Sequence, residues 1–167
     1  MKNLTRDEAR ARAALLEVAS YDVVLDLSGE AGFDSQSTVH FISGEPGAGS
    51  FIELDGELVD AQLIGRSLGP LEGNRLALPD LAPDNVLVVR ARCAYSRTGE
   101  GLHRFIDPAD GRAYLWAMSF LDDAQRMFAC FDQPDLKASI TLTVDAAFVE
   151  QQLSGIAKNA DLSRYVL

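Results

Sequence analysis

Few residues of this sequence have types and spacing suited to chemistry, and the first candidate is the stretch ISGEPGAGSF at residues 42–51. Gly44 and Gly49 are separated by four residues and Ser50 follows, which is close to the spacing of a phosphate-binding loop. Such a loop needs a lysine after its second glycine and then a helix, so that backbone N–H groups face the phosphates. Here the following residues alternate as in a strand. The stretch is therefore predicted to be a loop between strands, without a nucleotide.

The second candidate set consists of the two histidines and the two cysteines, His40, His103, Cys93 and Cys130. Together they could supply four zinc ligands, and a cysteine beside a histidine could act as a nucleophile. No two of them have CxxC or HxxxH spacing, and both cysteines have apolar neighbours. We expect separate packing or surface positions for all four, and no metal site in this chain.

Asp122 and Asp123 are adjacent carboxylates, the third candidate for chemistry. A carboxylate pair needs an enclosed site to act as acid and base. The polar surroundings of this pair indicate a helix cap or solvent-exposed side chains instead. Residue types alone therefore predict no catalytic group.

The charge balance restricts the possible partners. Fifteen basic and 25 acidic residues give a formal net charge of −10, whereas nucleic acids and anionic membrane surfaces attract cationic proteins. No apolar run approaches the ~20 residues of a membrane span, and residues 1–18 lack the apolar centre of a signal peptide. Two cysteines fit a reducing compartment. We expect a cytoplasmic protein that binds neither nucleic acid nor membrane.

The pattern of apolar residues predicts a mainly β protein, a β-sandwich with a helix at each end. Thr5 and Glu8 form a capping-box pattern, which predicts a helix over residues 6–17. Alternation of period two then predicts strands over residues 20–28, 37–43, 50–54, 58–65, 74–79, 85–95, 113–120 and 137–145. Residues 105–115 have the turn chemistry of a hairpin. A second helix is predicted over residues 145–159.

One long segment resembles a known family. Residues 101–144, and above all FACFDQPDLKA at 128–138, are similar to the end of the N-terminal domain of aminopeptidase N, a family of zinc metallopeptidases. SYDVVLDLSGE at 20–30 and the segment at 37–56 fit the opening strands of that domain, so the resemblance covers about residues 3–146. It implies a β-saddle, with Phe128, Phe131, Pro134 and Leu136 as core residues that define the fold.

The resemblance also implies a role. In the family this domain supports a catalytic domain and lines the cleft that receives the peptide N-terminus, while an HExxH helix and a distant glutamate elsewhere hold the zinc. This sequence contains neither, so it is expected to bind no zinc and to be inactive alone. Its cleft residues would be Met118, Ser119 and Phe120. Family members usually carry glutamine and glutamate where Met118 and Phe120 stand; these two could line an apolar pocket or pack inward.

The C-terminal residues resemble a second family. From about residue 140, and most specifically in DLSRYVL at 161–167, the sequence is similar to the C-terminus of the ATPase subunit of the HslUV protease. That resemblance implies an alternative function, an interaction module that docks on an HslV-type peptidase ring. The docking residues would be Leu162, Ser163, Arg164, Tyr165, Val166 and Leu167. A helix that packs on the sandwich is the other interpretation of this segment.

The two resemblances divide the chain into an N-terminal β-domain, residues 1–146, and a C-terminal helix and tail, residues 147–167. A fragment, a fusion and a complete gene product all fit this division. If the last saddle strands are missing, one edge of the sheet is left unpaired, and an unpaired edge is a template for self-association. The expected partners are therefore a catalytic domain or a peptidase ring, a peptide substrate, and a second copy through that edge unless the C-terminal helix covers it.

Overall fold

The computed structural model describes residues 2–120 and 122–144. About half of these residues lie in strands and far fewer in helices, which confirms the mainly β fold class. The elements in chain order are α1 (Arg6–Leu15), β1 (Leu16–Asp26), β2 (Gly32–Ser43), β3 (Ser50–Glu53), β4 (Glu57–Leu63), β5 (Arg66–Ser67), β6 (Arg75–Leu78), β7 (Asp84–Ala94), β8 (Gly101–Ile106), β9 (Ala113–Met118), the 3-10 helix η1 (Ala124–Arg126) and β10 (Ser139–Val144). The predicted second helix and the predicted domain of residues 147–167 lie outside the described residues.

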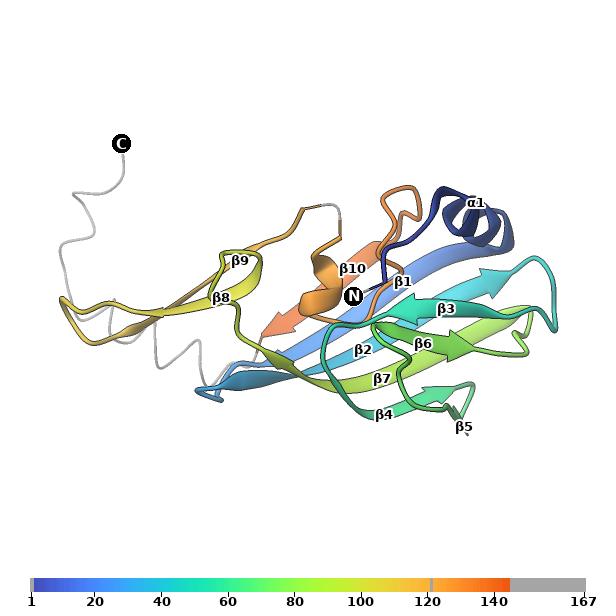
Figure 1. Ribbon diagram of the computed structural model, residues 1–167. Coiled ribbons are helices and arrows are strands. Elements are labelled where there is room, and N and C mark those ends of the chain that lie inside the picture. The colour runs from blue at the N-terminus through green and yellow to red at the C-terminus, as the bar shows by residue number, and fades with distance from the viewer. Residues whose placement is uncertain (1, 121, 145–167) are drawn as a thin grey trace.

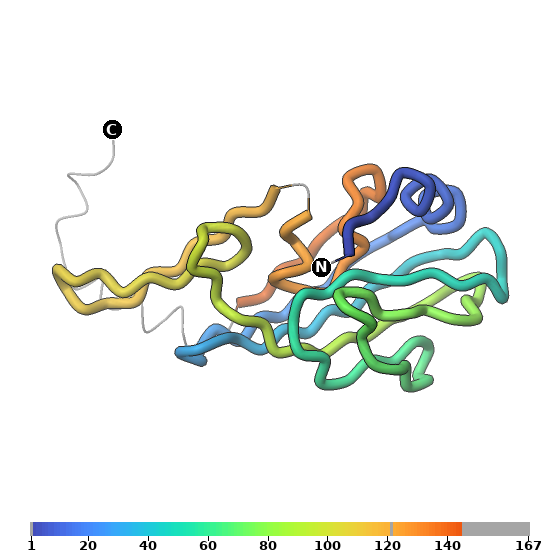
Figure 2. Tube along the Cα trace, in the orientation of Figure 1, coloured from blue at the N-terminus to red at the C-terminus, as the bar shows by residue number. Residues whose placement is uncertain are grey.

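The strands form one large sheet and two small ones. The large sheet has the order β10-β1-β2-β7-β4-β5. Neighbouring strands of this sheet run antiparallel, except that β10 pairs with β1 in parallel. The pair β3–β6 lies over one face of this sheet, and the β8–β9 hairpin projects beyond its end (Figure 1). Figure 2 shows the same arrangement along the Cα trace.

The hydrophobic core lies between the large sheet and the β3–β6 pair. Along β1 and β7 buried and exposed side chains alternate, as expected for strands with one solvent-facing side. The fully buried side chains come from both layers: Val23, Phe33, Val39, Ile52, Leu54, Leu63, Leu76, Leu78, Leu81, Leu87, Val89 and Cys93. Burying this apolar surface provides the main driving force for folding.

The N-terminal helix begins as the sequence predicts and ends two residues earlier. The Glu8 backbone N–H donates to the Thr5 hydroxyl (3.2 Å), and the Thr5 N–H donates to the Glu8 carboxylate (2.9 Å), so the capping box is present. At the other end Leu16 is already extended and 4% exposed. Strand β1 therefore starts directly after the helix, because Leu16 and Val18 are needed in the core.

The glycine-rich stretch connects β2 and β3, as predicted. The Gly44 N–H donates to the Leu15 carbonyl (2.9 Å), and the Gly47 N–H donates to the Leu81 carbonyl (2.7 Å). Gly47 has a φ of +85°, a conformation that favours glycine. These backbone donors are used inside the protein, and strand β3 follows where a phosphate-binding loop has a helix.

Candidate functional site

The β8–β9 hairpin carries a surface of aromatic side chains. The predicted turn is present: the Asp107 carboxylate accepts the Ala109 N–H (2.8 Å), and Gly111 has a φ of +72°. The register pairs His103 with Trp116 and Phe105 with Tyr114. Paired residues share a face of a hairpin and alternate residues along a strand return to it. We call this surface the aromatic hairpin face; it comprises His103, Phe105, Tyr114, Trp116 and Met118.

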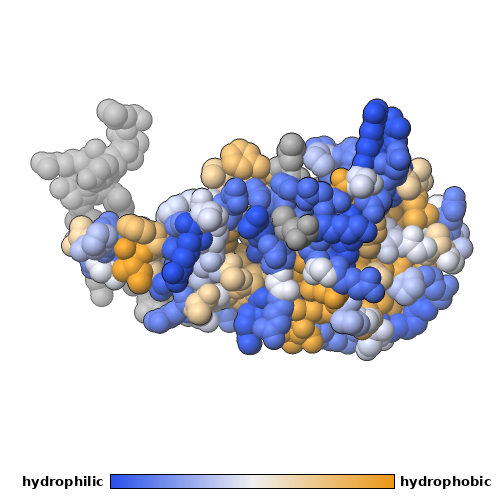
Figure 3. Space-filling view, in the orientation of Figure 1, coloured by the Kyte–Doolittle hydropathy of each residue, from blue (hydrophilic) through white to orange (hydrophobic). Residues whose placement is uncertain are grey.

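The aromatic hairpin face is open to solvent on the described chain. Phe105, Tyr114, Trp116 and Met118 each have 41–46% of their surface exposed. The His103 and Trp116 rings stack with centroids 4.0 Å apart. Figure 3 shows hydrophobic residues among hydrophilic ones along the projecting hairpin. Apolar side chains gathered on one exposed surface are typical of an interaction site.

The three predicted cleft residues lie where the hairpin returns to the body of the domain. Met118 ends β9, and Ser119 and Phe120 follow it. Phe120 is 67% exposed and Met118 is 41% exposed, so neither packs inward. Inward packing, one of the two alternatives for these side chains, is therefore not observed, and their lining of an apolar pocket stays a prediction.

Asp123 fixes the backbone at Phe120. Its buried carboxylate accepts the Phe120 N–H (3.1 Å) and the Arg126 Nε–H (3.2 Å). Arg126 also lies 3.6 Å from the Glu100 carboxylate, next to the start of β8. Asp123 is the N-cap residue of η1, as expected for a helix cap, but its side chain makes no cap bond and is buried instead of solvent-exposed. Asp122, in contrast, is exposed.

A hollow of about 340 Å³ begins at Ser119 and Phe120 and continues to β10. Its lining is mostly apolar and includes Tyr21, Phe128, Phe131, Leu136 and Ile140. The Tyr21 hydroxyl accepts the Phe131 N–H (3.1 Å) at the base. Burial raises the pKa of the Tyr21 hydroxyl and of the Asp132 carboxyl, which also lines the hollow. This arrangement can hold an apolar group, and its lining carries two charged side chains, Asp132 and Lys137.

Of the four core residues predicted in the FACFDQPDLKA segment, Pro134 is predicted wrongly. Phe131 is buried, and Phe128 and Leu136 pack partly against the core, as expected. Pro134 is exposed instead. It occupies the turn closed by the Leu136 N–H and the Gln133 carbonyl (3.1 Å), where its fixed φ favours the chain reversal.

The histidines and cysteines are dispersed, as the sequence predicts. His40 lies on the solvent side of β2, whereas Cys93 on the neighbouring β7 is buried in the core. Cys130 is buried opposite Glu53, and His103 lies on the hairpin. In the part of the chain that the structure describes, no group of three or more His, Cys, Asp or Glu side chains could hold a metal ion.

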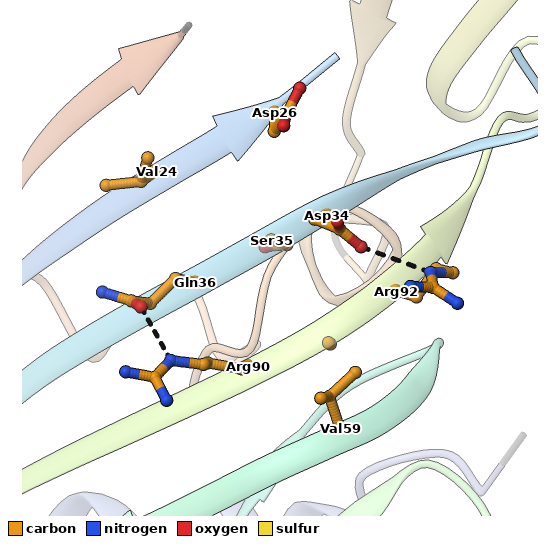
Figure 4. A pocket seen from close by; sticks show the side chains of 9 residues that line it. Val24, Asp26, Asp34, Ser35, Gln36, Val59, Arg90 and Arg92 are labelled. Atoms are coloured by element: carbon orange, nitrogen blue, oxygen red, sulfur yellow. Dashed lines mark hydrogen bonds and ion pairs between the residues drawn. The ribbon is translucent and has the colours of Figure 1, made fainter. Parts of the chain in front are cut away.

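A second hollow, of about 280 Å³, lies on the solvent face of the large sheet and was not expected from the sequence (Figure 4). Arg92 donates to Asp34 (3.3 Å) and Arg90 to Gln36 (3.0 Å) across β7 and β2. Val24 and Val59 lie beside them. Both arginines that line the hollow already donate to side chains of β2, so the hollow is an ordinary sheet surface.

Two remaining predictions concern membrane spans and the C-terminal docking residues. Among the described helices, none is long and apolar enough to cross a membrane. The docking residues predicted at 162–167 lie outside the described residues.

Comparison with known proteins places the chain in context. It is 51% identical over 152 residues to aminopeptidase N of Streptomyces lividans, covering 86% of this chain but 18% of that relative. A solved M1 zinc metallopeptidase from Deinococcus radiodurans has the same fold, with a TM-score of 0.59 and 23% identity over 78% of this chain. A mutant two-domain M1 zinc metallopeptidase bound to L-arginine gives a TM-score of 0.61, with 21% identity over 80% of this chain.

This chain spans only part of each of those proteins, 32% and 33% of the solved chains. No family model matches it. These relatives give no support to the resemblance between the C-terminal residues and the HslUV ATPase subunit. The resemblance of this chain to the N-terminal domain of the aminopeptidase N-type zinc metallopeptidases is confirmed.

Proposed function

We propose that this chain is a non-catalytic domain of a zinc aminopeptidase, which supports the catalytic domain and lines the cleft for the peptide N-terminus. One observation carries the proposal: the aromatic hairpin face is exposed, and its last residue, Met118, is followed directly by Ser119 and Phe120. Large apolar side chains exposed together favour contact with another protein surface. The identity to an aminopeptidase N and the share of that protein which this chain spans support the same assignment.

The zinc of the proposed enzyme belongs to its catalytic domain. The described residues of this chain do not fit a zinc site, because their histidines and cysteines lie on separate elements. This chain would contribute shape and apolar surface, and hydrolysis would require the catalytic domain.

The cleft residues would set how the substrate N-terminus is held. Met118 and Phe120 present apolar surface where the family resemblance places a glutamine and a glutamate. An ammonium group therefore loses a charge-assisted hydrogen bond there. We expect this domain to favour an apolar first side chain and to recognise the free amine weakly.

The supporting role is tested in a hybrid enzyme, in which residues 1–144 replace the matching portion of the Streptomyces lividans aminopeptidase N. We expect an active, co-folded enzyme. Tyr114→Ser with Trp116→Ser should lower its melting temperature by several degrees, because exposed apolar contacts at the domain boundary are lost. Val24→Ser is the control, since Val24 and Trp116 are equally exposed (44%) but Val24 lies on the large sheet. Equal effects of the two changes would contradict the supporting role.

The cleft role is tested in the same hybrid by changing Met118→Gln together with Phe120→Glu. We expect KM for a substrate with a free N-terminal amine to fall about tenfold, the effect of ~1.4 kcal/mol. Phe105→Gln is the control on the same hairpin face but away from its junction with the domain. If both variants leave KM and kcat unchanged, these residues do not line the cleft.

A further inference from the structure

The 3-10 helix η1 is fixed to the core by its central residue, Gln125, whose side chain is buried. The Gln125 amide oxygen accepts from Asn74 Nδ2 (2.7 Å), and the amide nitrogen donates to Asp132 Oδ2 (3.2 Å). The Gln125 backbone carbonyl accepts the Asp55 N–H (2.8 Å). A buried polar side chain whose hydrogen bonds are made holds its neighbours rigidly. The turn η1 is therefore a fixed point from which the next residue, Arg126, reaches toward the β8–β9 hairpin.

Arg126 supports the first strand of the hairpin directly. Its stem packs against Gly101, at the start of β8: a Cβ on Gly101 would lie 3.1 Å from Arg126 Cβ and 3.3 Å from Arg126 Cδ. Its Nη2 lies 3.6 Å from Glu100 Oε2. Strand β8 is also tied to the end of β7, because the Ser96 N–H donates to the Leu102 carbonyl (2.8 Å). The first strand thus has two separate contacts with the body of the domain.

Arg126 holds the end of the second strand through Asp123. Arg126 Nε donates to Asp123 Oδ1 (3.2 Å), and Asp123 Oδ2 accepts the Phe120 N–H (3.1 Å) just after β9 ends. The Asp123 carboxylate is buried, and a buried carboxylate is stable only beside a cation or several donors. The bond that fixes Phe120 therefore depends on the Arg126 guanidinium. One arginine meets both strands where the hairpin joins the domain.

We propose that Arg126 is a positioning residue for the cleft segment Met118–Phe120: it fixes the direction in which the hairpin leaves the domain and the backbone that carries the cleft side chains. The hairpin projects beyond the large sheet, so a small rotation at its base moves its aromatic face much further (Figure 1). Positioning of the cleft segment rests on the proposed function, whereas the hold of Arg126 on the hairpin can be tested without it.

The hold on the hairpin is tested by amide hydrogen exchange of the complete chain. Arg126→Gln keeps most of the stem that packs against Gly101 but removes the charge, so exchange of the Phe120 N–H should become about tenfold faster. The Asp55 N–H, bonded to Gln125, should keep its exchange rate because η1 stays anchored. Arg126→Lys, which restores the charge, should recover part of the protection of the Phe120 N–H.

The control is Arg112→Ala, which removes another hairpin arginine that lies 4.0 Å from an aspartate, Asp110, but at the turn. It should leave the exchange of the Phe120 N–H unchanged. Unchanged exchange of Phe120 in Arg126→Gln would overturn the proposal. So would equal acceleration at Phe120 and Asp55, because a general loss of stability exposes both amides.

The effect on the cleft is tested in the hybrid enzyme. Adding Arg126→Gln to the variant with Met118→Gln and Phe120→Glu should abolish its about tenfold fall in KM and leave kcat unchanged, because the new glutamate is no longer held in place. Adding Arg112→Ala should preserve the fall in KM. A fall that survives Arg126→Gln would contradict positioning of the cleft segment. If Met118→Gln with Phe120→Glu has no effect on its own, the proposed cleft role fails, and the exchange rates alone decide whether Arg126 holds the hairpin.

Discussion

Arg12 and Glu53 form a buried ion pair, with 2.7 Å between Arg12 Nη1 and Glu53 Oε2 and with 2% and 4% of the two side chains exposed. Arg12 also donates through Nε to Gln133 Oε1 (2.9 Å). Its guanidinium lies 4.8 Å from the ring centroid of Phe51 and 5.6 Å from that of Phe131. One arginine thus joins α1 to β3 and to the FACFDQPDLKA segment, three parts of the chain that are distant in sequence.

Removing one partner of this pair should destabilise the domain strongly. Glu53→Gln keeps the shape but leaves a buried guanidinium without a counter-charge, which costs about 3–5 kcal/mol. Urea denaturation followed by Trp116 fluorescence measures the free energy of unfolding. The control is Asp80→Asn in the exposed pair with Arg66, for which we expect a loss of at most about 1 kcal/mol. Equal losses of unfolding free energy in the two variants would contradict a stabilising role of the buried Arg12–Glu53 pair.

Glu8 should make the domain sensitive to acid. A hydrogen bond from Arg75, followed by those from Thr5, holds the pKa of Glu8 far below its ordinary value of 4.5. Below pH 4.5 the Glu8 carboxylate is therefore protonated in the unfolded chain but stays ionised in the folded chain. The stabilisation is complete above pH 4.5 and is lost as the pH falls below it.

Glu8→Gln should therefore flatten the decline of unfolding free energy below pH 4.5. Urea denaturation at a series of pH values measures this slope. Asp7→Asn, one residue away, is the comparison, since Asp7 forms no ion pair within the described part of the chain. A decline that Asp7→Asn flattens as much as Glu8→Gln would assign the effect to helix charge in general.

Both thiols should be unreactive in the folded protein. Burial raises the pKa of Cys93 to about 12 and the pKa of Cys130 well above its ordinary value. Because the thiolate is the reactive form, alkylation at pH 8 should be negligible until urea unfolds the chain. Mass spectrometry should then find two labels, and one in the Cys93→Ala variant. Rapid labelling without urea would show that the region around a cysteine opens.

Two glycines with the same backbone conformation should differ in how they tolerate alanine. Gly101 and Gly111 both have a φ of +72°, so alanine is strained at either position by about 1–2 kcal/mol. A Cβ at position 101 would also lie 3.1 Å from Arg126 Cβ, whereas a Cβ at position 111 meets open space. Gly101→Ala should therefore lower the urea midpoint more than Gly111→Ala. The opposite order would mean that the turn, and not the junction with Arg126, limits hairpin stability.

Much of the fold could be predicted because its signals are local. The Thr5–Glu8 cap starts α1, and alternation along residues 20–28 and 85–95 identifies β1 and β7. The boundary between α1 and β1 at Leu16 could not be predicted, since residues 16 and 17 also suit a helix. Only burial of Leu16 in the core decides between helix and strand. Sequence position likewise suggested a solvated or capping Asp123, whereas its Phe120 and Arg126 partners exist only once the hairpin and η1 lie together.

The sequence by itself determined the strand periodicity, the turn chemistry, the dispersed histidines and cysteines and the resemblance to aminopeptidase N, because each depends on residue type and spacing along the chain. Tertiary structure decided which residues meet. It brought Arg12 against Glu53 across 41 positions, exposed Met118 and Phe120, and paired β10 with β1. Contacts between distant segments follow from packing the whole core, and no local pattern encodes them.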